Sequence, residues 1–205
     1  MVWFWKSDGL NPIFICTMAQ RPTPTLHTAL KERNWDTINH LLRTGDAERF
    51  SQQNDQGQTP LHIAASEGLE QAVASMITQD TPLNPQDNQK RNPLHCAASA
   101  QRYKICDMLL RARADATALT SNDNSPLSLL VLESSQNKDR IDVLRRMIIH
   151  GANPNQQNSA GETALSRACE SGDLAVVELL LSRSASLLLP RKYVFGHRFF
   201  VKFRN

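Results

Sequence analysis

Three histidines recur at a nearly constant spacing and are the first candidates for chemistry in this chain. His62 and His95 are 33 positions apart, and His27 lies 35 positions before His62. Two of them end related tetrapeptides, Thr59-Pro60-Leu61-His62 and Asn92-Pro93-Leu94-His95. Histidine serves proteins as a general acid or base and as a metal ligand. A position that repeats along the chain predicts a role that repeats in the fold, so we expect these histidines to be structural.

One combination, His95 and Cys96 with Cys106, resembles part of a metal site. The chain has four cysteines, which form no C-x-x-C pair and no zinc-like spacing: Cys16, Cys96, Cys106 and Cys169. No fourth ligand is spaced to complete the set, so neither a metal nor another cofactor is expected. Buried, reduced thiols are the simpler interpretation, and they favour an intracellular protein, cytoplasmic or nuclear.

No catalytic motif accompanies these residues. The sequence lacks a phosphate-binding G-x-x-x-x-G-K-[ST], a dinucleotide-binding G-x-G-x-x-G, a zinc-protease H-E-x-x-H and a nucleophile elbow G-x-S-x-G. We therefore expect a protein that is not an enzyme.

Composition and charge exclude two further classes of function. The 205 residues are 40% hydrophobic and carry 23 Lys+Arg against 20 Asp+Glu. No apolar run reaches the ~20 residues that span a bilayer. Five bases and no acid fall in residues 188–205, so the rest of the chain has 18 bases against 20 acids, a net charge of −2. That body lacks the basic surface that nucleic-acid binding needs.

The elements that position the histidines repeat as well. Ser125-Pro126-Leu127-Ser128 and Thr163-Ala164-Leu165-Ser166 follow in phase with the two earlier tetrapeptides. Small residues come next, then an apolar stripe at helical spacing such as Val176, Leu179 and Leu180, and each unit ends in a turn signal such as 151–155. This order predicts two short helices and a turn in every unit, stacked because no unit can bury its apolar face alone.

The sequence resembles the ankyrin-repeat family over roughly residues 21–187. The best match holds the family's threonine, proline, leucine, histidine, alanine and glycine positions, at Gly57, Thr59, Pro60, Leu61, His62, Ala64, Ala65 and Gly68. The resemblance implies an all-α solenoid of stacked helix-turn-helix units with β-turn or hairpin tips. We place the units near 21–53, 54–86, 87–119, 120–157 and 158–187. In the family, the histidine bonds backbone of the turn and of neighbouring repeats.

Several units depart from the pattern. Lys90 stands where glycine closes the turn, and unit four has Leu129 to Leu132 in place of small residues. Unit five has Ala164 and Ser166 for proline and histidine. A polar insert from Ser134 to Arg140 is expected to lengthen the loop between the two helices of unit four. It is either a tolerated surface insertion or a docking or modification loop.

The family resemblance implies binding through the concave strip formed by the turn tips and the inner helices. The sequence predicts that partner-binding strip at positions that do not hold the stack together: Asp55, Gln56, Gln58, Ser66, Glu67, Asn88, Gln89, Arg91, Ser99, Ser121, Asn122, Asn124, Glu133, Glu162 and Glu170. Arg91 is the one residue of the usual anchor types in this set. The leading hypothesis is a monomeric, non-enzymatic scaffold or adaptor that binds a protein partner. The alternative is a membrane- or RNA-targeting module that acts through the basic aromatic C-terminal tail. A third hypothesis is that these repeats belong to a larger enzyme or ubiquitin-ligase adaptor.

Both ends differ from the repeats. Residues 1–20 form an N-terminal extension, which we interpret either as an upstream extension of the reading frame before Met18 or as an amphipathic segment that binds a membrane or a partner. Residues 188–205 alternate basic and aromatic side chains, as in Arg198-Phe199-Phe200. This tail could target anionic lipid or RNA, or it could be a sequence appended by alternative splicing in place of a sixth repeat.

Overall fold

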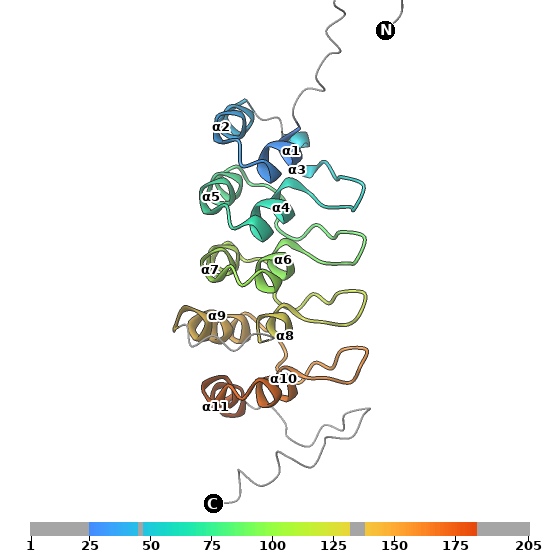
Figure 1. Ribbon diagram of the computed structural model, residues 1–205, viewed down its shortest axis with the longest axis vertical. Coiled ribbons are helices and arrows are strands. Elements are labelled where there is room, and N and C mark those ends of the chain that lie inside the picture. Colours follow the sequence, from blue (N-terminus) through green and yellow to red (C-terminus); the bar gives the residue numbers. More distant parts are fainter. Residues whose placement is uncertain (1–24, 45–46, 132–137, 184–205) are drawn as a thin grey trace, which may run out of the picture.

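Paired helices follow one another in single file along the chain (Figure 1). The computed structural model describes residues 25–44, 47–131 and 138–183. Its helices are α1 (Leu26–Lys31), α2 (Trp35–Arg43), α3 (Ala47–Ser51), α4 (Pro60–Glu67), α5 (Glu70–Thr78), α6 (Pro93–Ser99), α7 (Tyr103–Arg111), α8 (Pro126–Leu130), α9 (Lys138–Ile149), α10 (Ala164–Ser171) and α11 (Leu174–Ser182). The described residues contain no strand, and their stacking confirms the all-α solenoid.

The helices form two layers. The inner layer, α1, α4, α6, α8 and α10, lies beside the loops that project to one side of the stack, and the outer layer, α2, α5, α7, α9 and α11, lies on the far side (Figure 1). Neighbouring inner helices contact one another, as do neighbouring outer helices. The concave side is therefore bounded by the inner helices and the projecting loops.

A polar residue starts each inner helix. The side chains of Asn92, Ser125 and Thr163 accept hydrogen bonds from the backbone N–H three residues later, at 3.0, 3.2 and 3.1 Å. Proline takes the next position in α4, α6 and α8, where its missing N–H costs no helical hydrogen bond. The tetrapeptide motif is thus a helix-start signal.

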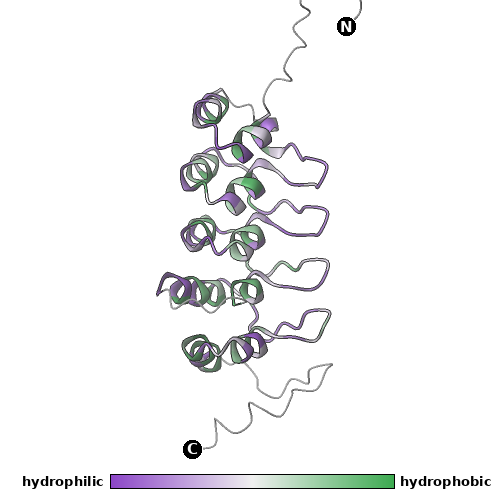
Figure 2. Cartoon of the chain, in the orientation of Figure 1, coloured by the Kyte–Doolittle hydropathy of each residue, from purple (hydrophilic) through white to green (hydrophobic). Residues whose placement is uncertain are grey.

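Small and aliphatic side chains make one continuous core through the stack. Ala64, Ala65, Ala97 and Ala98 have no exposed surface, because adjacent inner helices approach closely at these positions. Figure 2 shows the hydrophobic residues concentrated in the paired helices. Burial between units, rather than inside any one of them, stabilises the fold.

Unit four is the most irregular. Its inner helix α8 has 5 residues and its outer helix α9 has 12, whereas α4 and α5 have 8 and 9. The prediction that the insert reaches Arg140 is wrong, because residues 138–140 form the first turn of α9. Arg140 is fully buried, and its guanidinium pairs with the Asp173 carboxylate at 2.8 Å, which joins α9 to the start of α11.

Three segments with sequence-based predictions lie outside the described residues. They are the N-terminal extension 1–20, the insert positions 132–137, which include Glu133, and the tail 188–205. The short helix α3 was not predicted from the sequence.

Candidate functional site: the concave strip

Four five-residue turns stand at the tips of the projecting loops and share one hydrogen-bond pattern. These tip turns are residues 54–58, 87–91, 120–124 and 158–162. In each, the first residue donates its N–H to the fifth carbonyl at 2.9–3.0 Å, and the fourth donates to the first carbonyl at 2.8–2.9 Å. The side-chain oxygen of the first residue also accepts the third and fifth N–H groups, as Asn158 Oδ1 does at 3.0 and 2.8 Å.

Successive tip turns are bonded to each other. The N–H of the second residue donates to the third carbonyl of the preceding turn, in Asn88 to Gln56 at 3.1 Å, Ser121 to Gln89 at 2.9 Å and Ser159 to Asn122 at 3.0 Å. Because these bonds are between backbone groups, most side chains at the second and third positions remain available to a partner. Two second-position side chains are engaged with the preceding turn: Asn88 Nδ2 donates to the Asp55 carbonyl at 3.1 Å, and the Ser159 hydroxyl donates to Asp123 Oδ2 at 3.0 Å.

The repeated histidines fix the distance between the inner helices and the tip turns. The Nε2 atoms of His27, His62 and His95 donate to the carbonyls of Gln58, Arg91 and Asn124 at 2.9, 2.9 and 3.2 Å. In the ring of His62, Nδ1 accepts the Thr59 N–H at 3.1 Å. Burial lowers the pKa of His62 and lowers that of His95 to about 4, so both rings are neutral donors at pH 7.

Unit four has Ser128 at the histidine position of the motif, and an arginine of the next unit makes the contact between units instead. At Ser128, the histidine position, the hydroxyl turns back to the Ser125 carbonyl at 2.9 Å. Arg167 on α10 donates to the Ser128 carbonyl at 3.2 Å, to Asn124 Oδ1 at 3.0 Å and to Glu162 Oε2 at 3.1 Å. Its side chain is 12% exposed. Arg167 therefore joins units four and five by contacts that the motif did not predict.

The predicted strip residues fall into two rows along the concave side. The tip turns carry the first row, in which the second and third positions are exposed: Asp55, Gln56, Asn88, Gln89, Ser121 and Asn122. The inner-helix ends carry the second row, in which Ser99 and Glu170 are exposed and Ser66 and Glu67 are half-buried. Glu133 has no described position.

Four predicted residues are less exposed than the rest of the first row. Gln58, Arg91, Asn124 and Glu162 are the fifth residues of the tip turns and are half-buried. The guanidinium of Arg91 lies on the Asp87 carboxylate, with Nη2 to Oδ2 at 2.8 Å and 31% of its side chain exposed. Burial opposes ionisation of Asp87, but its hydrogen bonds from Arg91 prevail and lower the pKa of that carboxyl. Arg91 is thus engaged within its own turn.

Two exposed tip residues were missed by sequence reasoning. Lys90 and Asp123 are the fourth residues of their turns, with φ of 57° each, at positions where Gly57 and Gly161 stand in the other tip turns. Their signal in the sequence is the replacement of glycine at the sharpest point of the turn, which leaves a charged side chain at the tip.

His95, Cys96 and Cys106, the candidate metal ligands, are not arranged as a metal site. Burial raises the pKa of Cys96 to about 11 and raises that of Cys106 further, which disfavours the thiolate that a metal needs. His95 already uses both ring nitrogens on backbone groups. Among the described residues, no three His, Cys, Asp or Glu side chains cluster as metal ligands.

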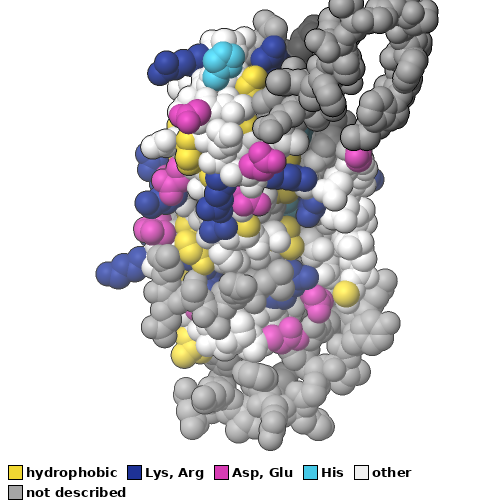
Figure 3. All heavy atoms as spheres, turned by 45° about the horizontal axis from the view of Figure 1, so that its top comes forward, with side chains coloured by type: hydrophobic (Ala, Val, Ile, Leu, Met, Phe, Trp, Pro, Cys, Tyr) yellow, Lys and Arg dark blue, Asp and Glu magenta, His cyan; other side chains and the backbone are white. Residues whose placement is uncertain are grey.

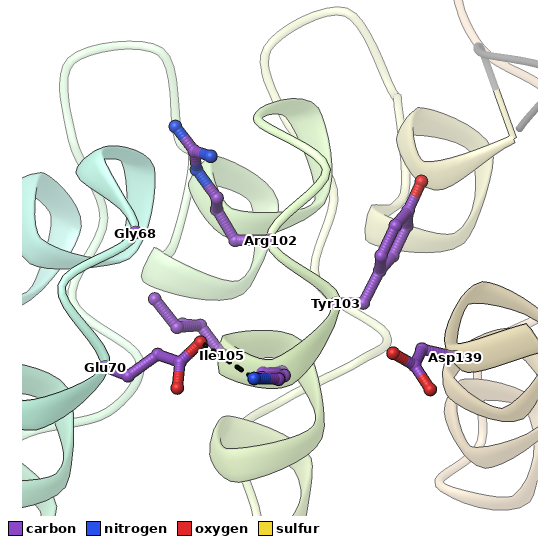
Figure 4. Close-up of a pocket in the computed structure, with 7 residues that line it drawn as sticks. Gly68, Glu70, Arg102, Tyr103, Ile105 and Asp139 are labelled. Carbon is purple, nitrogen blue, oxygen red and sulfur yellow. Dashed lines mark ion pairs between the residues drawn. The ribbon is translucent and has the colours of Figure 1, made fainter. Parts of the chain in front are cut away.

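Two shallow cavities lie along the stack. One of about 500 Å³ lies between α1 and the first tip turn and is lined by His27, Lys31 and Asp55 among others. The other, of about 230 Å³, lies between the helix-connecting loops (Figure 4), with Glu70, Arg102, Tyr103 and Asp139 around it and Lys104 Nζ 3.7 Å from Glu70 Oε1. Neither holds an arrangement of catalytic groups.

Charge is mixed rather than of one sign. On the face shown in Figure 3, Lys and Arg side chains lie beside Asp and Glu side chains. Within the ranges described, every helix is too short or too polar to cross a membrane.

Comparisons with known proteins agree with this geometry. A profile described as ankyrin repeats (3 copies) matches residues 26–123, and one described as ankyrin repeats (many copies) matches residues 132–181. Rabankyrin-5 of Homo sapiens is 31% identical over 68% of this chain and 14% of its own length. The tyrosine-protein kinase Shark of Drosophila melanogaster is 26% identical over 81% of the chain and 17% of its own length. Human neurogenic locus notch homolog protein 1 is 27% identical over 87% of the chain and 7% of its own length.

The chain spans only a small part of the length of each of these relatives. With both profiles matching along the helical stack, the chain belongs to the ankyrin-repeat family.

Proposed function

We propose that this protein is a non-enzymatic scaffold or adaptor that binds a partner polypeptide along the concave strip. The repeats, placed near 21–53, 54–86, 87–119, 120–157 and 158–187, act as one binding body. The observation that carries the proposal is the row of exposed side chains at the second and third positions of successive tip turns, held in register by turn-to-turn backbone bonds. Ankyrin repeats generally mediate protein interactions, which supports the same proposal.

Rigidity makes such a strip suitable for binding. Each tip turn is closed by its own backbone and side-chain bonds and is tied to the inner helices by histidine or Arg167. Binding a partner therefore costs little conformational entropy, whereas a flexible loop would lose much of it on binding. The exposed row is rich in Asn, Gln and Ser, whose side chains both donate and accept hydrogen bonds, so it suits the backbone and polar side chains of a polypeptide.

The test is partner capture by the full chain compared with two matched variants. The strip variant carries Gln56→Lys, Gln89→Lys and Asn122→Lys, and the control carries three lysines at exposed outer-helix positions, Asn39→Lys, Gln71→Lys and Thr78→Lys. Proteins co-purified with each are quantified by mass spectrometry. We expect the strip variant to lose partners that the wild type and the control both retain. Equal retention by the strip variant would overturn the concave-strip assignment.

A further inference from the structure

Two arginines from adjacent repeats enclose one carboxylate on the outer-helix side of the stack. The Nε of Arg111 lies 2.8 Å from Asp107 Oδ2, and the Nε of Arg146 lies 2.7 Å from Asp107 Oδ1. The side chains of Arg111 and Arg146 are 66% and 36% exposed, so both are partly accessible to solvent, although the Nε of Arg146 is buried. Each guanidinium has five N–H donors, and the two therefore have the capacity to take a second carboxylate beside Asp107.

Two further arginines lie close to this pair in the sequence. Arg113 follows the end of α7, and Arg145 precedes Arg146 on α9; both are exposed, and neither makes an ion pair with another described residue. We name Arg111, Arg113, Arg145 and Arg146 the arginine patch. Against its four positive charges stand Asp107 and the exposed Asp142, which leaves a local net charge of +2.

An exposed apolar side chain adjoins the patch. Ile149 is 67% exposed and lies four residues after Arg145, one turn along the same face of α9. An isoleucine this exposed gains nothing from folding, but it would gain from contact with an apolar side chain of a partner.

We propose that the arginine patch and Ile149 bind a carboxylate-bearing segment of a partner polypeptide that also carries apolar side chains. The planar guanidinium fork matches carboxylate geometry, and Asp107 already occupies the patch in that way. An anionic membrane fits less well, because Asp107 and Asp142 would face its headgroups. This surface lies on the outer helices, opposite the concave strip (Figure 1), so the two proposals are tested independently.

The probe is a fluorescein-labelled peptide in which glutamate alternates with leucine, measured by anisotropy with the full chain. The comparison probes are the same peptide with glutamine in place of glutamate, and vesicles of phosphatidylserine and phosphatidylcholine. We expect binding to the glutamate peptide that weakens as salt is raised, with weaker binding to the glutamine peptide and to the vesicles. Preference for the vesicles or for the glutamine peptide would overturn the proposal, as would a failure to bind the glutamate peptide.

Two variants with the same change in charge locate the site. Arg111→Gln, Arg113→Gln and Arg145→Gln together leave the Arg146–Asp107 pair in place, and the control combines Arg43→Gln, Arg102→Gln and Arg183→Gln elsewhere on the surface. The patch variant should weaken binding about tenfold or more and the control less than about twofold. Ile149→Ser should weaken it about threefold or more without changing the salt dependence. Equal losses in both triple variants would show that only net charge matters and would overturn the proposal.

Discussion

Individual side chains in this stack both cap their own helix and bond to a neighbouring unit, and the repeat motif predicts only some of these contacts. His62 and His95 accept a backbone N–H at the start of their own helices through Nδ1 and donate to the next tip turn through Nε2, and this double contact requires a neutral ring. Arg167 also joins two units, but it lies on the later unit and donates hydrogen bonds to residues of the earlier one. Units joined by histidine and units joined by arginine should therefore respond differently to acid.

Acid should destabilise the histidine-joined units first. The folded pKa of His95 is about 4, against about 6.5 in an unfolded chain, so between these values the unfolded state binds more protons. Stability is complete above pH 6.5 and falls as the pH drops towards 4, by about 3 kcal/mol for His95. His62 has a lowered pKa as well and adds to the loss.

Urea unfolding between pH 7 and pH 4 measures this loss. His95→Gln keeps a donor that does not titrate, so its stability should change less over the same window. Asp87 is protonated only at lower pH, because the pKa of that carboxyl is lowered from its ordinary value of 3.8. If wild type and His95→Gln lose equal stability between pH 7 and pH 4, the neutral-ring argument is wrong.

Arg167 should matter more than a surface arginine. Replacing it by Met keeps most of the volume but leaves Glu162 and the Ser128 carbonyl without these hydrogen bonds, at a cost of about 2 kcal/mol. Arg183, exposed beyond α11, is the matched control, and its Met variant should change stability by less than about 0.5 kcal/mol. Chemical denaturation of both variants checks the difference, and similar values for the two would contradict the bridging role.

Among the helices and turns, the recurring constraint is a residue in the left-handed region. It occurs once in each tip turn, and glycine occupies it in two of the four, at Gly57 and Gly161. A side chain at Gly57 would lie 2.5 Å from Asn88 Oδ1, so glycine is required there by contact as well as by φ. Lys90 and Asp123 bear the strain of a non-glycine residue at φ of 57°.

Lys90→Gly should therefore stabilise the protein. The gain from relieving the left-handed strain exceeds the entropy that glycine adds to the unfolded chain, and the net change is about 0.5–1 kcal/mol. Gln89→Gly, one residue earlier and outside the left-handed set, should be destabilising by a similar amount. The midpoints of thermal unfolding distinguish the two variants, and a lower midpoint for Lys90→Gly would refute the strain argument.

Over the helices that the structure describes, burial is greatest in the inner helices at the middle of the stack. Every residue from Pro60 to Ala65 in α4 and from Pro93 to Ala98 in α6 is buried, because neighbours cover both sides of these helices. In α1 and α10 only three residues each are buried. Stability should then vary along the stack, since each unit is stabilised mainly by its neighbours.

Hydrogen exchange should reveal this gradient. Backbone amides in α4 and α6 should exchange about tenfold or more slowly than those in α1 and α10 under native conditions. Amide exchange read by mass spectrometry on the full chain measures it, with α5 and α7 as an internal comparison of the outer layer. Uniform protection from α1 to α10 would mean that the stack opens as one cooperative unit.

The phased tetrapeptides alone were enough to predict the helical pairs, their stacking and the family, because capping residues, proline at the first helical position and small residues act locally. The strip was predicted as a row of positions, four of which are half-buried in their turns, and Arg167 was not predicted. Which side chains of a turn face solvent depends on hydrogen bonds between units, such as His62 to the Arg91 carbonyl across 29 residues. The repeat period cannot encode those contacts, because they depend on how the next unit packs, and that is set only when the stack forms.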